Sequence, residues 1–542
     1  MTDRTLPAHP SLDQYKKQAK ELVRAVAGHD AGGLARIRKH HPRLKSVPES
    51  EIEAIALADA QLVLAREHGY DSWPQFSKHI EILHIIRSVE NLPDPVSTFL
   101  EVASVERHGG HSSGTLEHAN LILERYPDVA GANIFTAAIL GDDARLSGFL
   151  AHNRDETRSL ATTRGGPLQW DPLTYLCFSR YLRIDRARSE GFVRAARALL
   201  EAGASANACW YDAIDDPPRQ APETAIYGAA GIAQHAGVTR LLLEYGADPN
   251  DEETPYHVPE TGDNTVLEII LDSGRFNASS LATVLARKAD WHDEKGLALA
   301  LAHGANPNFL TAWKVTPFQH AIRRDNSLAA IEQFLEYGAD PLIRNKLDHR
   351  DAFQMAAYHG RGDVMDLFMA RGFTVRYDEA IDRLVAACAR ADRPAIDQVI
   401  HGNALVADQL LEIGGTLLSR FAGAGNLAGL RALLDLGISA NSLWADGDPY
   451  WSLAKDSRAL HSAAWRARHD VVCELIARGA EVNATDARGR TPLQLAVGAC
   501  LDSYWKASRK PDSVAALLAA GAATDGIDLP SGYEAIDELL IR

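Results

Sequence analysis

The phrases Arg458-Ala-Leu-His-Ser-Ala-Ala464 and Ala477-Arg-Gly-Ala-Glu-Val-Asn483 decide the fold of this chain, because each recurs along its 542 residues. The first phrase is typical of a helix start, and its variants are Thr224-Ala-Ile-Tyr-Gly-Ala-Ala230, Thr316-Pro-Phe-Gln-His-Ala-Ile322 and Thr491-Pro-Leu-Gln-Leu-Ala-Val497. The second phrase follows a Leu-rich helix, and its variants are Glu201-Ala-Gly-Ala-Ser-Ala-Asn207, Glu244-Tyr-Gly-Ala-Asp-Pro-Asn250, Ala302-His-Gly-Ala-Asn-Pro-Asn308 and Glu336-Tyr-Gly-Ala-Asp-Pro341. Glycine ends these helices, since it adopts a positive φ without steric penalty. A repeating unit of helix, turn, helix and loop predicts a solenoid.

The first phrase resembles the Thr-Pro-Leu-His-x-Ala-Ala pattern of ankyrin repeats. Threonine caps the helix, proline suits its first turn, and the small alanines let neighbouring helices approach each other. The Thr-like position predicts unit starts near Ala132, Asp171, Thr224, Thr265, Thr283, Thr316, Asp351, Asp382, Thr416, Arg458 and Thr491. We therefore expect an all-α ankyrin-repeat solenoid of about ten to eleven degenerate repeats over residues 131–526, with a capping helix at 527–542.

The N-terminal residues predict a small helical bundle over residues 1–90, followed by a helical linker over 91–130. Helices are expected from the capping box at Ser11 to Gly28, from Asp30 to about residue 40, over 49–68, and from Ser72 onward. The phrases Leu57-Ala-Asp-Ala-Gln-Leu62 and Gly69-Tyr-Asp-Ser-Trp-Pro74 resemble a helical module at the front of bacterial ankyrin-repeat proteins. That resemblance implies no particular activity.

Composition excludes several classes of protein. The chain is too long for a single hydrophobic core, and its net charge of −16 disfavours nucleic acid as the main partner. Residues 1–45 nevertheless carry ten Lys or Arg against four acidic residues, which leaves nucleic-acid attachment through the first helices as an alternative. No secretory pattern and no apolar run of spanning length is present, so we expect a cytoplasmic protein without membrane contact. The five cysteines form no C-x-x-C pair, which argues against disulfides and a metal site.

Candidate binding residues are those that break the repeat pattern with rings or charges. Lys288 is the clearest, because it occupies a position where the repeat places a small alanine, and a buried charge must find a partner. Replacing Lys288 with alanine would then be expected to stabilise the stack. We expect the candidates to share one pocket, thickened by insertions at 181–191 and 209–223. They are Trp170, Tyr175, Arg180, Tyr256, His257, Lys288, Asp290, Trp291, His292, Asp293, Lys455, Asp456, Trp465, Arg466, Asp502, Tyr504 and Trp505.

The function that this pattern favours is a binding scaffold that recognises a protein or peptide in its concave groove. The alternative is a small-molecule-binding or catalytic solenoid, with an ionisable pocket around Lys288, Asp290, His292 and His257. No nucleotide-binding, kinase, hydrolase or zincin motif is present, so no catalytic residue, cofactor or metal is predicted, and enzymatic activity is left open. The arrangement of the candidate side chains distinguishes the binding scaffold from the catalytic solenoid, since a catalytic site needs convergent ionisable groups in a closed pocket.

Overall fold

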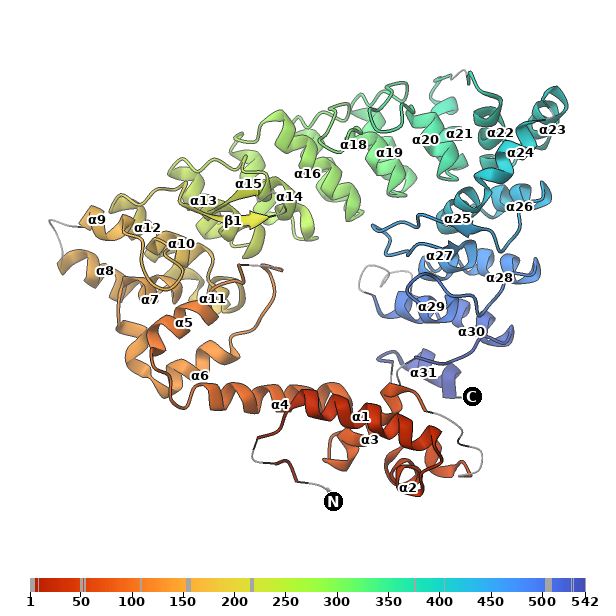
Figure 1. The fold of residues 1–542 in the computed structure, drawn as a ribbon. Coiled ribbons are helices and arrows are strands. Elements are labelled where there is room, and N and C mark those ends of the chain that lie inside the picture. The colour runs from red at the N-terminus through yellow and green to blue at the C-terminus, as the bar shows by residue number, and fades with distance from the viewer. Residues whose placement is uncertain are drawn as a thin grey trace. The chain divides into compact units, whose positions relative to one another are not determined.

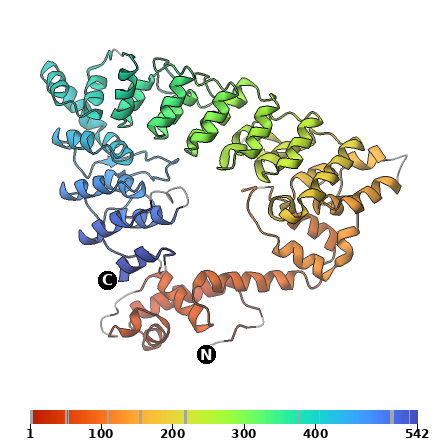
Figure 2. The same ribbon diagram turned by 180° about the vertical axis from the view of Figure 1, so that it is seen from behind.

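The computed structural model describes residues 5–7, 9–48, 52, 55–107, 110–152, 157–214, 219–374, 377–403, 405–502, 509–527, 529 and 531–541. The chain divides into two compact units, one formed by Met1–Leu83 with Arg350–Arg542 and the other by His84–His349. Both units are built almost wholly of helices, and the two sheets among the described residues are short two-stranded hairpins (Figures 1 and 2). No helix in the described ranges is long and apolar enough to cross a lipid bilayer.

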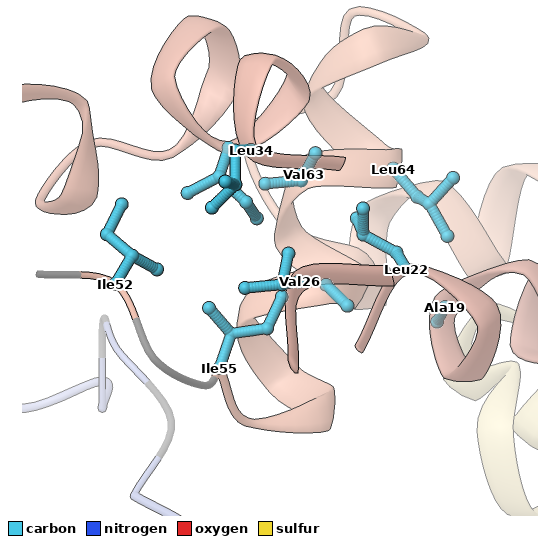
Figure 3. Close-up of a cluster of buried hydrophobic side chains, with 10 residues drawn as sticks. Ala19, Leu22, Val26, Leu34, Ile52, Ile55, Val63 and Leu64 are labelled. Carbon is cyan, nitrogen blue, oxygen red and sulfur yellow. The ribbon is translucent and has the colours of Figure 1, made fainter. Parts of the chain in front are cut away.

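The N-terminal bundle contains α1 (Leu12–Ala27), α2 (Ala31–His40), η1 (Leu44–Ser46), α3 (Leu57–Glu67) and α4 (Trp73–Ser88). Its core brings apolar side chains of α1, α2 and α3 together with Ile52 and Ile55 (Figure 3). Three helix starts agree with the prediction, but α3 begins at Leu57 and not at residue 49. The carboxylate of Asp59 accepts a hydrogen bond from the backbone N–H of Ala56 at 3.0 Å, which caps the helix there.

Residues 84–349 form a stack of helix pairs. The elements before the first repeat are α5 (Pro95–Ala103), α6 (Glu117–Arg125) and η3 (Pro127–Gly131), and α5 packs against α6 and α7. The first helices of successive units, here called the first-helix row, are α7 (Ile134–Ile139), α10 (Pro172–Cys177), η5 (Tyr227–Ile232), α14 (Glu253–His257), α16 (Ala278–Asp290) and α18 (Pro317–Arg323). The second-helix row consists of α8 (Asp143–His152), α12 (Ser189–Glu201), α13 (Ala236–Glu244), α15 (Thr265–Asp272), α17 (Glu294–Ala302) and α19 (Leu328–Glu336).

Short elements fill the connections of this stack. They are α9 (Thr157–Thr162), α11 (Arg180–Ile184), η4 (Arg186–Arg188), η6 (Val258–Glu260) and the antiparallel strands β1 (Cys209–Ile214) and β2 (Arg219–Thr224). The two predicted insertions thus contain α11, η4 and the start of α12 in one case, and the hairpin in the other.

Residues 350–542 repeat the same arrangement. First helices are α20 (Ala352–Tyr358), α22 (Ala380–Ala389), α25 (Gly414–Ala424), α27 (Ala459–Trp465) and α29 (Pro492–Leu501). Second helices are α21 (Gly362–Ala370), α23 (Arg393–Gly402), α26 (Leu427–Asp435), α28 (His469–Ala477) and α30 (Asp512–Ala519). An additional helix α24 (Val406–Glu412), the strands β3 (Leu443–Trp444) and β4 (Ser457–Arg458), and the final helix α31 (Glu534–Ile541), which packs on α30, complete this part.

The last residue of the Gly-containing phrase joins one unit to the next. The side chain of Asn308 donates to the carbonyl of Gly338 at 2.8 Å and accepts from the N–H of Asp340 at 2.9 Å. Asn207, Asn250, Asn441 and Asn483 make the same pair of bonds to the phrase that follows each of them. Each asparagine therefore sets the spacing between two loops.

The fourth position of the helix-start phrase has a similar bridging role. The Nδ1 atom of His461 accepts from the N–H of Arg458, while Nε2 lies 3.1 Å from the carbonyl of Ala484 and 3.2 Å from that of Arg490. Burial lowers the pKa of His461 to about 4, so the ring stays neutral and can accept at one nitrogen while donating at the other. The histidine therefore has a structural role in joining neighbouring units.

The predicted unit starts at Thr265 and Thr283 need the largest correction, whereas Asp382 and Thr416 lie only two residues inside α22 and α25. Thr265 begins α15, a second helix, and the first helix of that unit is the short α14, in a stretch that reads as a loop in the sequence. Thr283 lies inside α16, which begins at Ala278 with Asn277 as its cap, because the Asn277 carbonyl oxygen of the side chain accepts from the N–H of Ser280. The first helix of this unit is therefore longer than the repeat pattern implies.

Candidate functional site

The candidate site lies on the first-helix row of residues 84–349, where Arg287 connects α14 to α16. Its guanidinium lies 4.0 Å above the centre of the Tyr256 ring and donates to the Tyr256 carbonyl. It also donates to Glu260 at 2.5 Å and to Asp290 at 2.6 Å. A cation stacked on a ring and held by two carboxylates is rigid. Arg287 thus fixes Tyr256 and Glu260 in place.

Asp290 is the buried carboxylate that joins α16 to α18. Besides Arg287, the Nε2 of His320 and the Nε of Arg324 both contact its Oδ1 at 2.8 Å. Burial would raise the pKa of Asp290, but these three partners outweigh burial and lower it to about 2. Burial lowers the pKa of His320, so its ring is neutral, and the ring of Trp313 stacks on it with centroids 5.9 Å apart.

His257 is held between two glutamates of its own segment. Its Nε2 lies 3.1 Å from Glu253 and its Nδ1 lies 3.1 Å from Glu260. Burial would lower the pKa of His257, but the bonds to the two carboxylates raise it to about 9, so the ring is cationic at neutral pH. On its other side the ring packs against Tyr227 at 5.3 Å, and the Tyr227 hydroxyl lies 2.9 Å from Nδ1 of His111.

Trp170 and Tyr175 continue the same row toward α10. Both are buried, at 3% and 0% exposure, and their rings pack with centroids 5.4 Å apart. Trp170 packs against Trp210 of β1 at 5.2 Å, and Trp210 packs against His111 at 6.1 Å. A series of ring contacts therefore connects α10 with α14, although Trp170 and Tyr175 belong to the core and not to an exposed surface.

Lys288 lies next to Arg287 but makes a different set of contacts. Its side chain is fully buried, and Nζ donates to the carbonyl of Thr261 and to Oδ2 of Asp293, both at 2.8 Å. Asp293 also accepts from the side chain of Asn264 at 2.9 Å. The lysine stem fits because residue 296 is glycine, where a Cβ atom would lie 2.5 Å from Cδ of Lys288. Lys288 therefore connects α16, α17 and the segment before α15.

Three further predicted residues lie at the ends of helices. Trp291 and His292 form the turn after α16, where His292 has a φ of 51° and Trp291 is 45% exposed. Arg180 at the start of α11 donates to the carbonyl of Val102 at 3.0 Å and to Glu106 at 3.2 Å. Arg180 thus holds α11 against the end of α5.

The remaining predicted residues belong to the other compact unit, and they are Lys455, Asp456, Trp465, Arg466, Asp502, Tyr504 and Trp505. Tyr504 and Trp505 lie outside the described residues. Lys455 and Asp456 are exposed just before β4, whereas the guanidinium of Arg466 lies 4.0 Å above the ring of Trp451. Trp465 packs against a cluster of buried side chains that includes Trp451.

The structure thus brings Tyr256, His257 and Asp290 into one network through Arg287 and Glu260, whereas Lys288 and Asp293 form a separate ion pair. Sequence reasoning missed the residues that connect them, which are His111, Trp210, Tyr227, Glu253, Glu260, Arg287, Trp313, His320 and Arg324. Recognising α14 as a first helix would have placed Glu253 on the same helix as His257, and Glu260 directly after it, facing α16. Within the described ranges, no group of three or more His, Cys, Asp or Glu side chains is arranged to hold a metal ion.

Comparison with known proteins identifies one segment directly. A solved structure, the ankyrin repeat domain of human ASB11, is similar at 18% identity over 50% of this chain and 98% of that chain, with a TM-score of 0.21. So low a score carries no argument about function. Residues 457–487, which contain β4, α27 and α28, match the ankyrin repeat family. This segment is therefore similar to a single ankyrin repeat.

Proposed function

We propose that residues 84–349 form a binding scaffold for a peptide segment of a partner protein, which lies along the first-helix row. The observation that supports this most is the rigid set of side chains around Arg287. Tyr256, Glu260 and His257 are partly exposed, yet each is held by a buried or half-buried partner. Side chains that are ordered before binding lose little entropy on association, which favours affinity.

The side chains on and beside the first-helix row suit a peptide with both apolar and polar groups. Trp313 is 38% exposed and supplies a flat apolar surface, and the ring of His320 stacks against it. Glu253 and Glu260, which are 23% and 34% exposed, supply acceptors for backbone N–H groups or for a basic side chain. Aromatic and charged side chains in such surroundings are frequent hot spots of protein interfaces.

The geometry favours this scaffold over the small-molecule or catalytic alternative. The ammonium group of Lys288 contacts Thr261 and Asp293, whereas the carboxylate of Asp290 contacts arginines and a histidine. These two groups therefore do not form an acid–base pair across a shared space. Each is already neutralised by its own partners.

A selection from a random peptide library against the full chain tests the proposal. The dissociation constants of selected peptides are measured by fluorescence anisotropy for the wild type and for Trp313→Ala and Tyr256→Ala. Each substitution is expected to weaken binding about tenfold or more, because hot-spot residues contribute at least about 2 kcal/mol.

Tyr337→Ala is the matched control, because Tyr337 is 48% exposed at the end of α19 in the second-helix row. This variant is expected to bind selected peptides as the wild type does. Peptides that bind all variants equally, or that lose affinity only with Tyr337→Ala, would place the binding surface elsewhere. Circular dichroism confirms that each variant is folded.

A further inference from the structure

A cavity of about 570 Å³ lies in residues 350–542, bordered by α20, α21, α22 and α23. Its apolar wall includes Phe353, Met365, Met369, Phe373 and Val399. A volume of several hundred cubic ångströms with mainly apolar walls is typical of sites for small organic molecules. The cavity is separate from the network around Arg287, which belongs to the other compact unit.

The cavity exists because α23 is weakly packed. Ile396 is the one fully buried residue of this helix among the described residues, whereas Val399 borders the cavity. Small residues line the opposite sides, with Ala386 and Ala387 on α22 and Ala395 on α23. Because alanine side chains leave the space between the helices unfilled, the flexible methionines of α21 face a void and can adjust to an occupant.

The charge at the cavity comes from three charged residues, Arg383, Arg390 and Asp392, and the last two neutralise each other. Asp392 caps α23 by accepting from the N–H of Ala395, and it lies 3.8 Å from Nη1 of Arg390. Arg390 also contacts Asp366 at 2.6 Å. Arg383 is the third charged residue of the cavity wall. Among the described residues its guanidinium makes no ion pair with a carboxylate.

The position of Arg383 is nevertheless fixed. Its Nη1 donates to the carbonyls of Tyr377 at 2.9 Å and Asp378 at 3.3 Å. These two bonds leave Nε and Nη2, the edge of the guanidinium that binds a carboxylate through two parallel hydrogen bonds. An ordered cation with a free binding edge at the border of an apolar cavity selects an amphiphilic anion.

We propose that this cavity binds an amphiphilic carboxylate, with its apolar aryl or alkyl body between α21 and α23 and its carboxylate on Arg383. The apolar body gains burial against the methionine and phenylalanine side chains. The carboxylate gains two charge-assisted hydrogen bonds. A neutral molecule of the same shape gains only the burial of its apolar body.

Two naphthalene probes of equal size test the assignment on the full chain by isothermal titration calorimetry. The wild type is expected to bind 2-naphthoate with a dissociation constant below about 1 mM, and about tenfold or more tighter than the neutral 2-acetylnaphthalene. Arg383→Gln is expected to remove this difference by weakening the binding of 2-naphthoate alone. Arg371→Gln, an exposed arginine at the end of α21 outside the cavity wall, is the matched control and is expected to change neither affinity.

Ala395→Trp provides a second test, because the indole would occupy part of the cavity beside α23 and is expected to weaken the binding of both probes. Failure of the wild type to bind 2-naphthoate below about 1 mM would overturn the proposal. Equal affinity for the two probes would overturn it as well, since an apolar cavity without carboxylate recognition gives that result. Because Arg383 is exposed, its variant remains folded and decides the question even if Ala395→Trp does not fold.

Discussion

At the residue scale, His257 shows how a partly buried group can contribute to stability through its charge. The two glutamates on either side of its ring keep it protonated up to a pH of about 9. An unfolded chain releases the same proton near pH 6.5. The folded state therefore binds this proton more tightly than the unfolded state does.

The pH dependence of stability follows from that difference. Since the pKa of His257 is raised on folding, its stabilising effect is fully present below about pH 6.5 and is lost as the pH rises to about 9. We expect the wild type to lose on the order of 2 kcal/mol relative to His257→Gln between these values, after allowance for partial exposure. Urea unfolding of both proteins across this pH range measures the difference. Parallel stability curves would show that the glutamates do not hold the proton.

At the scale of elements, Lys288 joins parts of the stack that the repeat pattern would connect by alanine packing. A lysine at this position is accommodated because α17 supplies Asp293 at its start and Gly296 in its first turn. The carbonyl of Thr261 completes the contacts of the ammonium group. From the sequence we expected alanine to fit better at position 288. That expectation did not take into account that Gly296, which has no Cβ atom, leaves space for the lysine side chain.

Replacing Lys288 with alanine is accordingly expected to destabilise α16 and α17. The change leaves Asp293 without its cation and opens a cavity beside Gly296, and together these effects correspond to about 3 kcal/mol. Hydrogen exchange of the amides in α16 and α17 measures the loss of protection. Lys295→Ala, at an exposed position of α17, serves as control and is expected to change stability by less than about 0.5 kcal/mol. Increased protection of these amides in Lys288→Ala would contradict this prediction and support the expectation from sequence that alanine stabilises the stack.

At the scale of the whole molecule, stability is distributed along stacks of helix pairs. Each pair buries its apolar side chains against its neighbours, so a local defect is expected to stay local. Leu475 in α28 is fully buried and packs in the part of the chain that matches the ankyrin repeat family.

Leu475→Asp is expected to unfold α27–α30 while α10–α16 retain their protection from hydrogen exchange. The buried carboxylate and lost apolar contacts correspond to several kcal/mol, which exceeds what one helix pair can lose. Hydrogen exchange with mass spectrometry reports each segment separately. Leu443→Asp is the control, because Leu443 is 51% exposed. Loss of protection in α10–α16 as well would show that the chain unfolds as one cooperative block.

The sequence by itself determined the repeating architecture of this protein, because the signals for it are local. Glycine after a Leu-rich helix ends that helix, and Thr-Pro at a helix start begins one, whatever lies elsewhere in the chain. Short or atypical elements escaped this reasoning, since α14 has only five residues and α16 begins at Asn277 instead of Thr283. Local patterns therefore located most units but not all helix starts.

Only the tertiary structure decided which charged side chains meet. Arg287 and Glu260 are 27 residues apart, and Asp290 and His320 are 30 apart, so their contacts depend on the register of neighbouring units. That register is set by many packing contacts and by asparagine bonds between loops, none of which a single unit encodes. Lys288 was predicted to share a pocket with Asp290, but it contacts Thr261 and Asp293 instead. Residues two positions apart on a helix point in different directions, so the two side chains meet different neighbours.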